Sequence, residues 1–300
     1  MSRIAYVNGR YVPHGQAAVH VEDRGYQFGD GAYEVCEVLG GRLIDEQRHM
    51  TRLGRSLRAL GIRWPMTPSA LGVVLREVVR RNIVAEGIVY LQITRGVAPR
   101  DHAFPVPGVA PALVVTARTL ALAPRDERAA RGVNVVTVPD NRWERVDIKS
   151  IALLSNVFAK QHAREAGAFE AWFVDKDGFV TEGSSTNAWI VTAKGALVTR
   201  PAESGILRGI TRSVLVDHAG RERLRLEERR FSVAEALGAR EAFLTSATAN
   251  VTPIIKIDGK KVGNGRPGPI AAALRAAFRN AAETAPALST ISGGHTGSDN

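Results

Sequence analysis

The lysine in the stretch RVDIKSIALLSN, residues 145–156, is the side chain best suited to covalent chemistry. Of the seven lysines in the chain, only Lys149 comes just before an apolar run, residues 151–157, that we expect to be buried. Burial disfavours the charged form of an amine, and a neutral amine is the nucleophile of Schiff-base chemistry. On this stretch alone, the commoner explanation is structural, with the lysine stem packed and its charged end in solvent. Lys149 is therefore a catalytic candidate that needs support from other residues.

A carboxylate lies next to hydroxyl side chains in VTEGSSTNAW, residues 180–189. Glu182 precedes two serines and a threonine, so we expect hydroxyl and backbone donors to hold it in its ionised form. An ionised carboxylate in such a place can pair with a protonated ring nitrogen. The structural alternative is a salt-bridged glutamate in a turn.

Two loops have the composition of an anion site. In GILRGITRSVL, residues 205–215, glycines precede a predicted helix, and Thr211 adds a hydroxyl near its start. Backbone N–H groups at a helix N-terminus bind anions well. The second loop, TSATANVTP at residues 245–253, is small and rich in hydroxyls. Neither loop has the spacing of a nucleotide-binding loop, and no G-x-G-x-x-G follows a strand, so a single phosphate fits better.

A third loop could bind a carboxylate. In TRGVAPRDHAFP, residues 94–105, Arg100 and His102 are separated by one residue and point the same way in an extended chain. The arginine fork matches the two oxygens of a carboxylate. The alternative is a solvated surface loop. Tyr33, in the glycine- and aromatic-rich stretch RGYQFGDGAYEV at residues 24–35, is a further candidate, and the alternative there is a hairpin entrance with structural aromatics.

These groups together fit one cofactor and one kind of substrate. Pyridoxal phosphate requires a Schiff-base lysine, an acidic partner for its ring nitrogen and an anion site. An amino-acid substrate adds the need for a carboxylate clamp. The combination outweighs the structural explanation of Lys149.

Composition limits the class of protein to which this chain can belong. Its 300 residues, 45% hydrophobic, suit one or two globular domains. The single cysteine, Cys36, excludes an internal disulfide framework, and we expect no metal site. No apolar run approaches the roughly 20 residues of a membrane helix, and the N-terminus lacks the layout of a signal peptide. We therefore expect a cytoplasmic protein that does not enter a membrane.

The net charge of +10 raises the question of nucleic-acid binding. Most basic residues are arginines scattered over predicted helix faces, and none forms a long basic tail. No zinc, homeodomain or RNA-recognition motif occurs. We interpret the charge as solvated surface, with a few arginines left for anions, and expect no nucleic-acid partner.

Hydrophobic periodicity predicts the elements that must position these groups. Predicted hairpins cover residues 4–12, 31–44, 170–183 and 187–200, and further strands cover residues 88–96, 111–120 and 133–140. Residues 241–262 are predicted to form a strand and a hairpin. Predicted helices cover residues 46–61, 68–82, 153–167, 209–220 and 267–283. Residues 121–132, charged and proline-bearing, are interpreted as a linker.

Because strands and helices do not alternate regularly, we predict an α+β fold in two domains. A small N-terminal α/β domain is placed at residues 1–121, and a larger C-terminal α/β domain that carries Lys149 at residues 122–283. Residues 284–300 are small and polar, and are predicted to form a disordered tail.

Six stretches of the chain, taken in order, resemble the D-amino-acid transaminases. They are DRGYQFGDGAYEV, TRGVAPRDHAFP, DIKSIALLSN, VTEGSSTNAW, ILRGITR and TSATANVTP. These belong to the fold-type-IV group of pyridoxal-phosphate enzymes, which also holds branched-chain aminotransferases and aminodeoxychorismate lyase. The likeness runs from about residue 4 to residue 282 with few gaps. It implies a two-domain fold-type-IV structure with pyridoxal 5′-phosphate as cofactor.

The resemblance also implies roles for the matching residues. Lys149 would form the Schiff base with the cofactor and shuttle the substrate's proton, and Glu182 would pair with the pyridine nitrogen. Tyr33, Arg100 and His102 would hold the substrate's α-carboxylate. The other cofactor-binding residues implied by the likeness are Arg52, Ser185, Leu207, Gly209, Ile210, Thr211, Ser246 and Ala247.

Two features depart from the family pattern. Ala247 stands where the best-known pattern has a hydroxyl residue, so we expect the phosphate site to lose one hydrogen bond, about 1 kcal/mol. The extra length in RTLALAPRDERAARG, residues 118–132, falls in the predicted linker and is expected to be harmless.

The activity that the resemblance implies is transfer of an amino group between D-amino acids and 2-oxo acids. D-Alanine, D-glutamate and D-aspartate, with pyruvate or 2-oxoglutarate, are the expected small-molecule partners. The family's members are homodimers with the site near the subunit contact, so we expect a homodimer. The alternatives on the same fold are a branched-chain L-amino-acid transaminase, an (R)-amine transaminase and an enzyme like aminodeoxychorismate lyase. A nucleic-acid-binding protein with a vestigial cofactor site is the alternative from another class.

Overall fold

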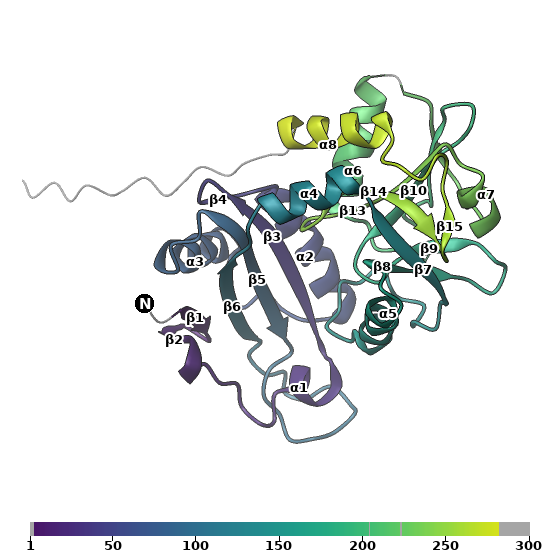
Figure 1. Cartoon of the computed structure of the whole chain (residues 1–300). Coiled ribbons are helices and arrows are strands. Elements are labelled where there is room, and N and C mark those ends of the chain that lie inside the picture. The colour runs from purple at the N-terminus through teal and green to yellow at the C-terminus, as the bar shows by residue number, and fades with distance from the viewer. Residues whose placement is uncertain (1–2, 204, 223, 282–300) are drawn as a thin grey trace, which may run out of the picture.

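The computed structural model describes residues 3–203, 205–222 and 224–281, and its strands form two sheets (Figure 1). The α+β fold predicted from the sequence is confirmed by these sheets and the helices around them. The boundary between residues 121 and 122 stays a prediction, and the predicted tail, residues 284–300, lies outside the described residues. Within the described ranges, no helix is long and apolar enough to span a membrane.

The first sheet has six antiparallel strands in the order β2-β1-β6-β5-β3-β4. These strands are β1 (Ile4–Val7), β2 (Arg10–Pro13), β3 (Gly31–Leu39), β4 (Arg42–Leu43), β5 (Glu86–Thr94) and β6 (Ala112–Thr119). Both hairpins predicted in this region are confirmed. At the first, Asn8 and Gly9 have φ angles of 45° and 94°, the left-handed geometry that a two-residue hairpin turn needs.

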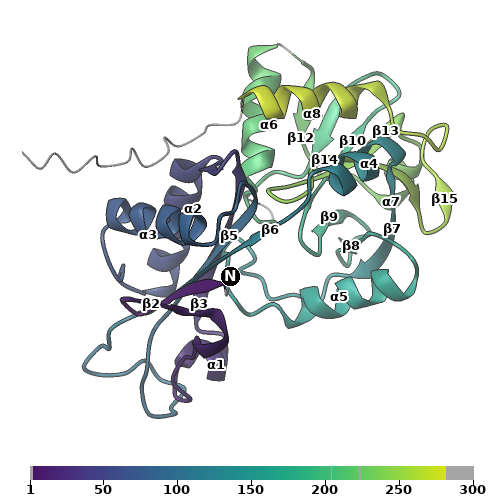
Figure 2. The same ribbon diagram turned by 60° about the vertical axis from the view of Figure 1, so that its left-hand side comes forward.

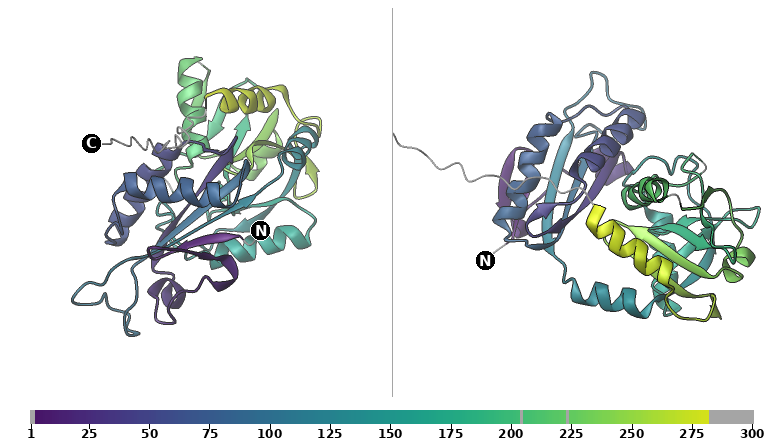
Figure 3. Two further views of the ribbon diagram at one scale, coloured as in Figure 1. Left: turned by 90° about the vertical axis from the view of Figure 1, so that its left-hand side faces the viewer. Right: turned by 90° about the horizontal axis from the view of Figure 1, so that it is seen from above.

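Two helices, α2 (Glu46–Leu60) and α3 (Pro68–Arg81), pack against this sheet, as Figures 2 and 3 show. Both were predicted, because apolar residues at spacings of three and four form a stripe on one face of a helix. Leu53, Leu57 and Leu75 from these stripes are almost completely buried. The orientation of α2 matters for the site, because the same helix carries Arg52.

A short helix that was not predicted, α1 (Arg24–Phe28), directly precedes β3. Asp23 caps its N-terminus by accepting a hydrogen bond from the Gly25 N–H at 2.8 Å. Gly29 ends the helix with a φ of 68°, a conformation that glycine adopts without strain. The hairpin entrance that we considered for this stretch is therefore one helical turn that leads into β3.

The second sheet has nine strands of mixed direction in the order β12-β11-β10-β13-β14-β7-β8-β9, with β15 paired to β14. Its strands are β7 (Val133–Pro139), β8 (Glu170–Val174), β9 (Val180–Gly183), β10 (Asn187–Val191), β11 (Leu197–Thr199), β12 (Leu226–Glu228), β13 (Glu241–Ser246), β14 (Asn250–Ile257) and β15 (Lys260–Lys261). The helices around it are α5 (Leu154–Glu165), α6 (Ile210–Arg221), α7 (Val233–Leu237) and α8 (Pro269–Ala281). Helices α6 and α8 share one apolar core with Trp189 and Phe243 of this sheet.

Residues 121–132, which we interpreted as a linker, lie between the last strand of the first sheet and the first strand of the second, and most of them form a helix that was not predicted, α4 (Ala123–Arg131). Pro124 lies in the first turn, where a missing N–H does no harm. Arg125 is buried and Asp126 forms ion pairs with α8, so tertiary contacts hold the helix in place. In Figure 1, α4 lies between the first sheet and the group formed by β14 and α8.

The apolar run after Lys149, residues 151–157, was expected to be buried and is largely at the surface instead. Helix α5 packs on β8 through two small residues, Ala159 and Ala163, and this leaves its first turn outside the core. Leu154 is 69% exposed and Val157 is 59% exposed. The environment of Lys149 must therefore be judged from the cavity beside it.

Candidate active site

A cavity of about 940 Å³ lies between the two sheets and is lined by residues from both. One wall comes from α1, β3 and α2, and the other from residues 142–157, the turn after β9, the start of α6 and the turn between β13 and β14. All but two of the site residues predicted from the sequence line this cavity. Those in the lining are Tyr33, Arg52, Lys149, Glu182, Ser185, Leu207, Gly209, Ile210, Thr211, Ser246 and Ala247.

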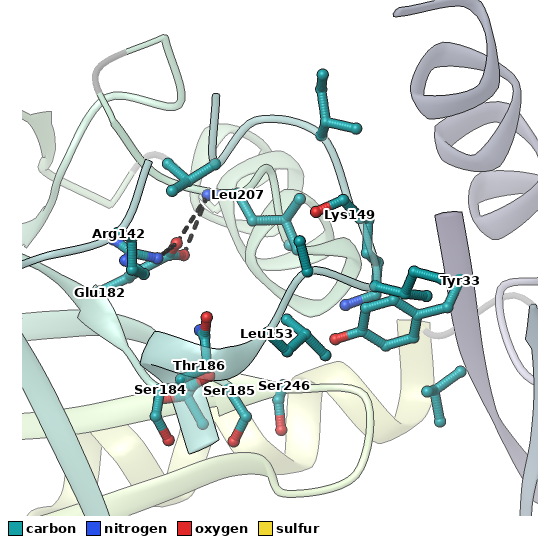
Figure 4. A pocket seen from close by; sticks show the side chains of 18 of the residues that line it. Tyr33, Arg142, Lys149, Leu153, Glu182, Ser184, Ser185, Thr186, Leu207 and Ser246 are labelled. Carbon is teal, nitrogen blue, oxygen red and sulfur yellow. Dashed lines mark hydrogen bonds and ion pairs between the residues drawn. The ribbon is translucent and has the colours of Figure 1, made fainter. Parts of the chain in front are cut away.

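Lys149 is held beside β3 by backbone hydrogen bonds. Its carbonyl accepts from the N–H of Tyr33 at 3.0 Å, and the N–H of Ile151 donates to the carbonyl of Gly31 at 3.1 Å. The N–H of Lys149 itself donates to Ser56 Oγ at 3.1 Å. The lysine Nζ lies 4.1 Å from the centre of the Tyr33 ring (Figure 4). The amine and the phenol therefore lie at the same end of the cavity.

Glu182 lies across the cavity from Lys149, as Figure 4 shows. Its buried carboxylate accepts hydrogen bonds from Arg142 Nη1 at 2.5 Å, Asn187 Nδ2 at 3.0 Å and the Leu207 N–H at 3.1 Å. Burial raises the pKa of Glu182 above its ordinary value, and Arg142 and Leu207 offset only part of that rise. Of the hydroxyl and backbone donors that we expected for this carboxylate, the backbone donor is confirmed in the Leu207 N–H, but an arginine and an amide take the place of the hydroxyl groups.

The serine hydroxyl groups that follow Glu182 in the sequence donate hydrogen bonds to another carboxylate, that of the completely buried Glu170. Ser185 Oγ donates to Glu170 Oε2 at 3.0 Å, and Ser184 Oγ donates to the other oxygen. Lys160 Nζ lies 3.5 Å from the same group. A serine has one hydroxyl hydrogen, and both serines use theirs on Glu170. They therefore present only acceptor lone pairs to the cavity that they line.

Arg142 lines the cavity but was missed in the sequence. It donates to both oxygens of Asp140, at 2.9 and 2.8 Å, as well as to Glu182. Its guanidinium also lies 4.4 Å from the centre of the Phe173 ring. Arg142 stands in a segment with neither helical nor strand periodicity, so no pattern indicated that it faces inward.

The N-terminus of α6, where the glycine-rich loop predicted an anion site, borders the cavity. Gly209 is the N-cap residue, and it lines the cavity with Ile210 and Thr211. A Cβ atom on Gly209 would lie only 2.0 Å from Asn187 Oδ1, so a larger residue would displace the side chain that binds Glu182. The first-turn N–H groups and the positive end of the helix dipole favour an anion here.

Arg52 of α2 reaches the same end of the cavity through a buried network. Its Nε and Nη2 donate to the two oxygens of Glu34 at 2.8 and 2.7 Å, and its Nη1 donates to the Arg208 carbonyl at 3.1 Å. His49 Nδ1 lies 2.7 Å from Glu34 Oε2. Burial alone would raise the pKa of Glu34, but Arg52 and His49 outweigh it and hold that pKa well below its usual range. Glu34 is thus a fixed anion that orients Arg52.

The turn between β13 and β14 contributes Ser246, Ala247 and Thr248 to the lining. Ser246 Oγ accepts a hydrogen bond from the Ala249 N–H at 3.1 Å and so braces its own turn. Side-chain hydroxyls flank Ala247 on both sides, and only its backbone can bind a ligand.

Arg100 and His102 are the two predicted site residues outside the cavity lining. Both are exposed in the loop between β5 and β6. The Arg100 guanidinium lies 5.1 Å from the centre of the Phe28 ring, and the His102 ring centre lies 5.5 Å from it. Phe28 itself lines the cavity. Buried Arg24 holds the loop by donating to the carbonyls of Asp101 and His102 at 2.6 and 3.3 Å.

Comparison with known proteins identifies the family. The family model for amino-transferase class IV matches residues 31–257. The D-alanine aminotransferase of Bacillus licheniformis is 41% identical over 273 residues, 91% of this chain and 95% of that protein. The D-alanine aminotransferase of Staphylococcus haemolyticus is 39% identical over 279 residues, 93% of this chain and 98% of that protein. This chain belongs to the class IV aminotransferases.

The likeness extends to the fold of a solved aminotransferase. The crystal structure of the branched-chain aminotransferase from Thermoproteus uzoniensis with norvaline has a TM-score of 0.81 to this chain. The match is 29% identical and covers 93% of this chain and 94% of that one.

The cavity of this class IV aminotransferase fits pyridoxal 5′-phosphate, the cofactor of its family. Lys149 offers an amine, Glu182 a carboxylate for the ring nitrogen, and the start of α6 an anion site. Thr186 Oγ1, which belongs to the lining, is buried without a partner among the described residues, so a polar ligand group can satisfy it.

Two of the missed residues could have been found in the sequence of this aminotransferase. Glu34 stands in the apolar strand GAYEVCEV, and a charge in a buried strand needs a partner. His49 and Arg52 are three residues apart on one predicted helix face and are suitable partners.

We predict that Glu34→Gln weakens folding and flattens its acid dependence. The substitution leaves buried Arg52 without its anion, which costs about 3–5 kcal/mol in the free energy of unfolding at pH 7. Because the pKa of Glu34 is depressed in the folded state, its contribution is complete above about pH 4.5 and is lost as the pH falls. The slope of that free energy between pH 3 and 4.5 should fall by up to about 1.4 kcal/mol per pH unit.

Urea unfolding over this pH range measures both effects. Glu127→Gln, at an exposed i,i+4 ion pair on α4, is the matched control and should leave the slope unchanged. An unaltered slope in Glu34→Gln would contradict the role given to the buried network.

Proposed function

We propose that this class IV aminotransferase moves amino groups between D-amino acids, such as D-alanine, D-glutamate and D-aspartate, and 2-oxo acids. The observation that carries this proposal is the likeness to D-alanine aminotransferases along nearly the whole chain. The opposed Lys149 and Glu182 in one cavity support it, because transamination needs an amine and a carboxylate at opposite ends of the cofactor.

Pyridoxal phosphate supplies an aldehyde that takes up the amino group and a ring that stabilises the electrons left on the substrate's Cα. Lys149 Nζ would take the proton from the substrate's Cα and deliver it to the C4′ carbon of the cofactor. Glu182 keeps a proton on the ring nitrogen, and Arg142 orients Glu182. Leu207, whose backbone is fixed by Glu182 and Asn187, covers the ring.

The phosphate of the cofactor would be held at the start of α6. Arg52 supplies the charge, and the N–H groups of Ile210 and Thr211 supply donors at the positive end of α6. Gly209 leaves room for the Asn187 side chain beside this turn, and its backbone is proposed to adjoin the phosphate. The remaining proposed contacts come from the Thr211 hydroxyl, Ser246 and the backbone of Ala247, while Ser185 contributes to the polar surroundings of the ring.

The substrate's α-carboxylate is held by Tyr33 together with Arg100 and His102. Because neither Arg100 nor His102 lines the cavity of its own chain, we propose a homodimer in which the second copy brings them to the cavity mouth. Exposed apolar side chains at the rim, Leu154 and Val157 of α5, support a contact there. Burying them against a second copy would also remove their exposure to water.

The first test is substrate preference. We expect turnover of D-alanine with 2-oxoglutarate to exceed that of L-leucine and of (R)-1-phenylethylamine by at least about two orders of magnitude, or some 3 kcal/mol in the transition state. Coupled assay of pyruvate formation measures the first rate. Faster turnover of L-leucine would identify a branched-chain enzyme, and pyruvate from aminodeoxychorismate without any 2-oxo acid would identify a lyase.

The second prediction concerns the lysine. Lys149→Ala should lose nearly all turnover, because no other lysine lines the cavity that the described residues form. Borohydride reduction of the wild-type holoenzyme, followed by peptide mapping, should place the pyridoxyl label on Lys149. Recovery of the label on another peptide, or substantial turnover by the variant, would contradict the assignment.

The third prediction concerns the carboxylate clamp. Arg100→Ala should raise the KM for D-alanine strongly, because a charged hydrogen bond to the carboxylate is worth roughly 1.5–3 kcal/mol. The affinity for pyridoxal phosphate should not change, because the proposed contact of Arg100 is with the substrate's carboxylate at the cavity mouth and not with the cofactor. A collapse of cofactor affinity would show that the clamp role is wrong.

A mixing experiment asks which subunit supplies Arg100. Lys149→Ala and Arg100→Ala chains are unfolded, refolded together and assayed at low D-alanine concentration. If Arg100 acts across a dimer, hybrids contain one intact site in two, and random mixing restores roughly a quarter of the wild-type rate. Activity no higher than the average of the two separate variants would show that Arg100 serves its own chain.

A further inference from the structure

Two neighbouring residues of α4 connect this helix to other parts of the protein. Arg125 Nη2 donates to Glu37 Oε1 on β3 at 2.6 Å, and both side chains are buried. Asp126 Oδ1 accepts from Arg275 Nη2 on α8 at 2.7 Å. Figure 1 shows α4 between the elements that carry these partners. The helix that joins the two sheets is therefore hydrogen-bonded to β3 of the first sheet and to α8, which packs on the second sheet.

The first connection continues to the turn between β13 and β14. With its amide oriented to satisfy its neighbours, Asn250 Nδ2 lies 3.2 Å from Glu37 Oε2 and 3.3 Å from the Ala247 carbonyl. Asn250 is 2% exposed and has a φ of 53°, so its backbone is in the left-handed region. A continuous chain of contacts thus runs from Arg125 through Glu37 and Asn250 to Ala247.

The second connection reaches the same turn from the other side. Arg275, held by Asp126, donates through Nη1 to the carbonyl of Ala249 at 3.1 Å and to that of Val251 at 2.8 Å. These carbonyls belong to the residues on either side of Asn250. Two independent contacts from α4 therefore fix one short piece of backbone.

That backbone lines the cavity through Ala247 and Thr248. In a planar trans peptide the carbonyl and the following N–H point in opposite directions, so holding the Ala247 carbonyl also fixes the Thr248 N–H. We propose that Glu37, Arg125, Asp126, Asn250 and Arg275 form a strap that positions the β13–β14 turn for the phosphate of the cofactor. This inference rests on the proposed function, because it assumes that the phosphate binds at this end of the cavity.

The composition of the strap favours positioning over stability. Arg125 Nε and Nη1 are buried without a partner among the residues that the structure describes. A buried ion pair with unsatisfied donors stabilises a fold less than an apolar contact of the same volume would. The pair does fix the orientation of the Glu37 carboxylate. One of its oxygens accepts from Arg125, and the other therefore faces Asn250.

Asn250→Gly tests the strap with little risk to the fold, because glycine adopts a left-handed backbone at no steric cost. The variant loses the side chain that joins Glu37 to Ala247. We expect its dissociation constant for pyridoxal phosphate to rise roughly tenfold. That rise corresponds to the loss of one charge-assisted hydrogen bond, from the Thr248 N–H to the phosphate. Its affinity for pyridoxal, which lacks the phosphate, should stay within about twofold of the wild-type value. Both constants are measured by dialysing the purified holoenzyme and titrating each aldehyde back while following absorbance.

Of two further variants, one tests the other end of the strap and the second is the control. Arg125→Met removes the charge at the other end of the strap and should show the same selective loss. Glu127→Gln, on the exposed face of the same helix, should bind both aldehydes as the wild type does. An Asn250→Gly variant with unchanged affinity for pyridoxal phosphate, or with equal loss for both aldehydes, overturns the strap alone. A wild-type protein that binds no pyridoxal phosphate overturns the proposed function and the strap with it.

Discussion

The backbone pairing between residues 149–151 and β3 is the constraint on which the site depends. Two hydrogen bonds, from the Tyr33 N–H to the Lys149 carbonyl and from the Ile151 N–H to the Gly31 carbonyl, bind a segment of the second half of the chain to the first sheet. Buried backbone groups must find partners, so this segment cannot slide without losing both bonds. The pairing places the lysine beside Tyr33, and it makes the cavity a product of both sheets.

Two arginines with buried side chains, Arg52 and Arg142, are fixed in direction by carboxylates and line the cavity. Arg52 is fixed by Glu34 at the phosphate end of the cavity, and Arg142 is fixed by Asp140 beside Glu182. A planar guanidinium that binds a carboxylate with two donors has a defined direction, which a lysine ammonium lacks. The basic composition was interpreted as solvated surface with a few arginines left for anions, and Arg52 and Arg142 are two arginines whose buried side chains bind carboxylates of the protein itself.

Local patterns predicted the elements well wherever one chemical rule acts within a few residues. The Asn8–Gly9 turn and the amphipathic stripes of α2 and α3 are of this kind. The site was predictable as a set of residues because glycine, hydroxyl and charged side chains gather in short motifs. The position of Arg142 was not, since its direction is set by Asp140 and Glu182 after folding. Helix α4 was missed because a proline and a high charge indicated a linker, while its Arg125 and Asp126 find partners on distant elements.

Two buried carboxylates of the site, Glu34 behind Arg52 and Glu182 in the cavity lining, differ in how completely their charge is balanced. Glu34 receives two donors from Arg52 and a contact from His49, and its pKa is depressed. Glu182 shares Arg142 with Asp140, and burial leaves its pKa raised. When environments push the pKa values of two acids apart in this way, the two acids have different tasks. Glu34 already has its cations and serves to hold Arg52. Glu182 is still able to gain stability from a further cation, and a protonated pyridine nitrogen held beside it is a cation of that kind.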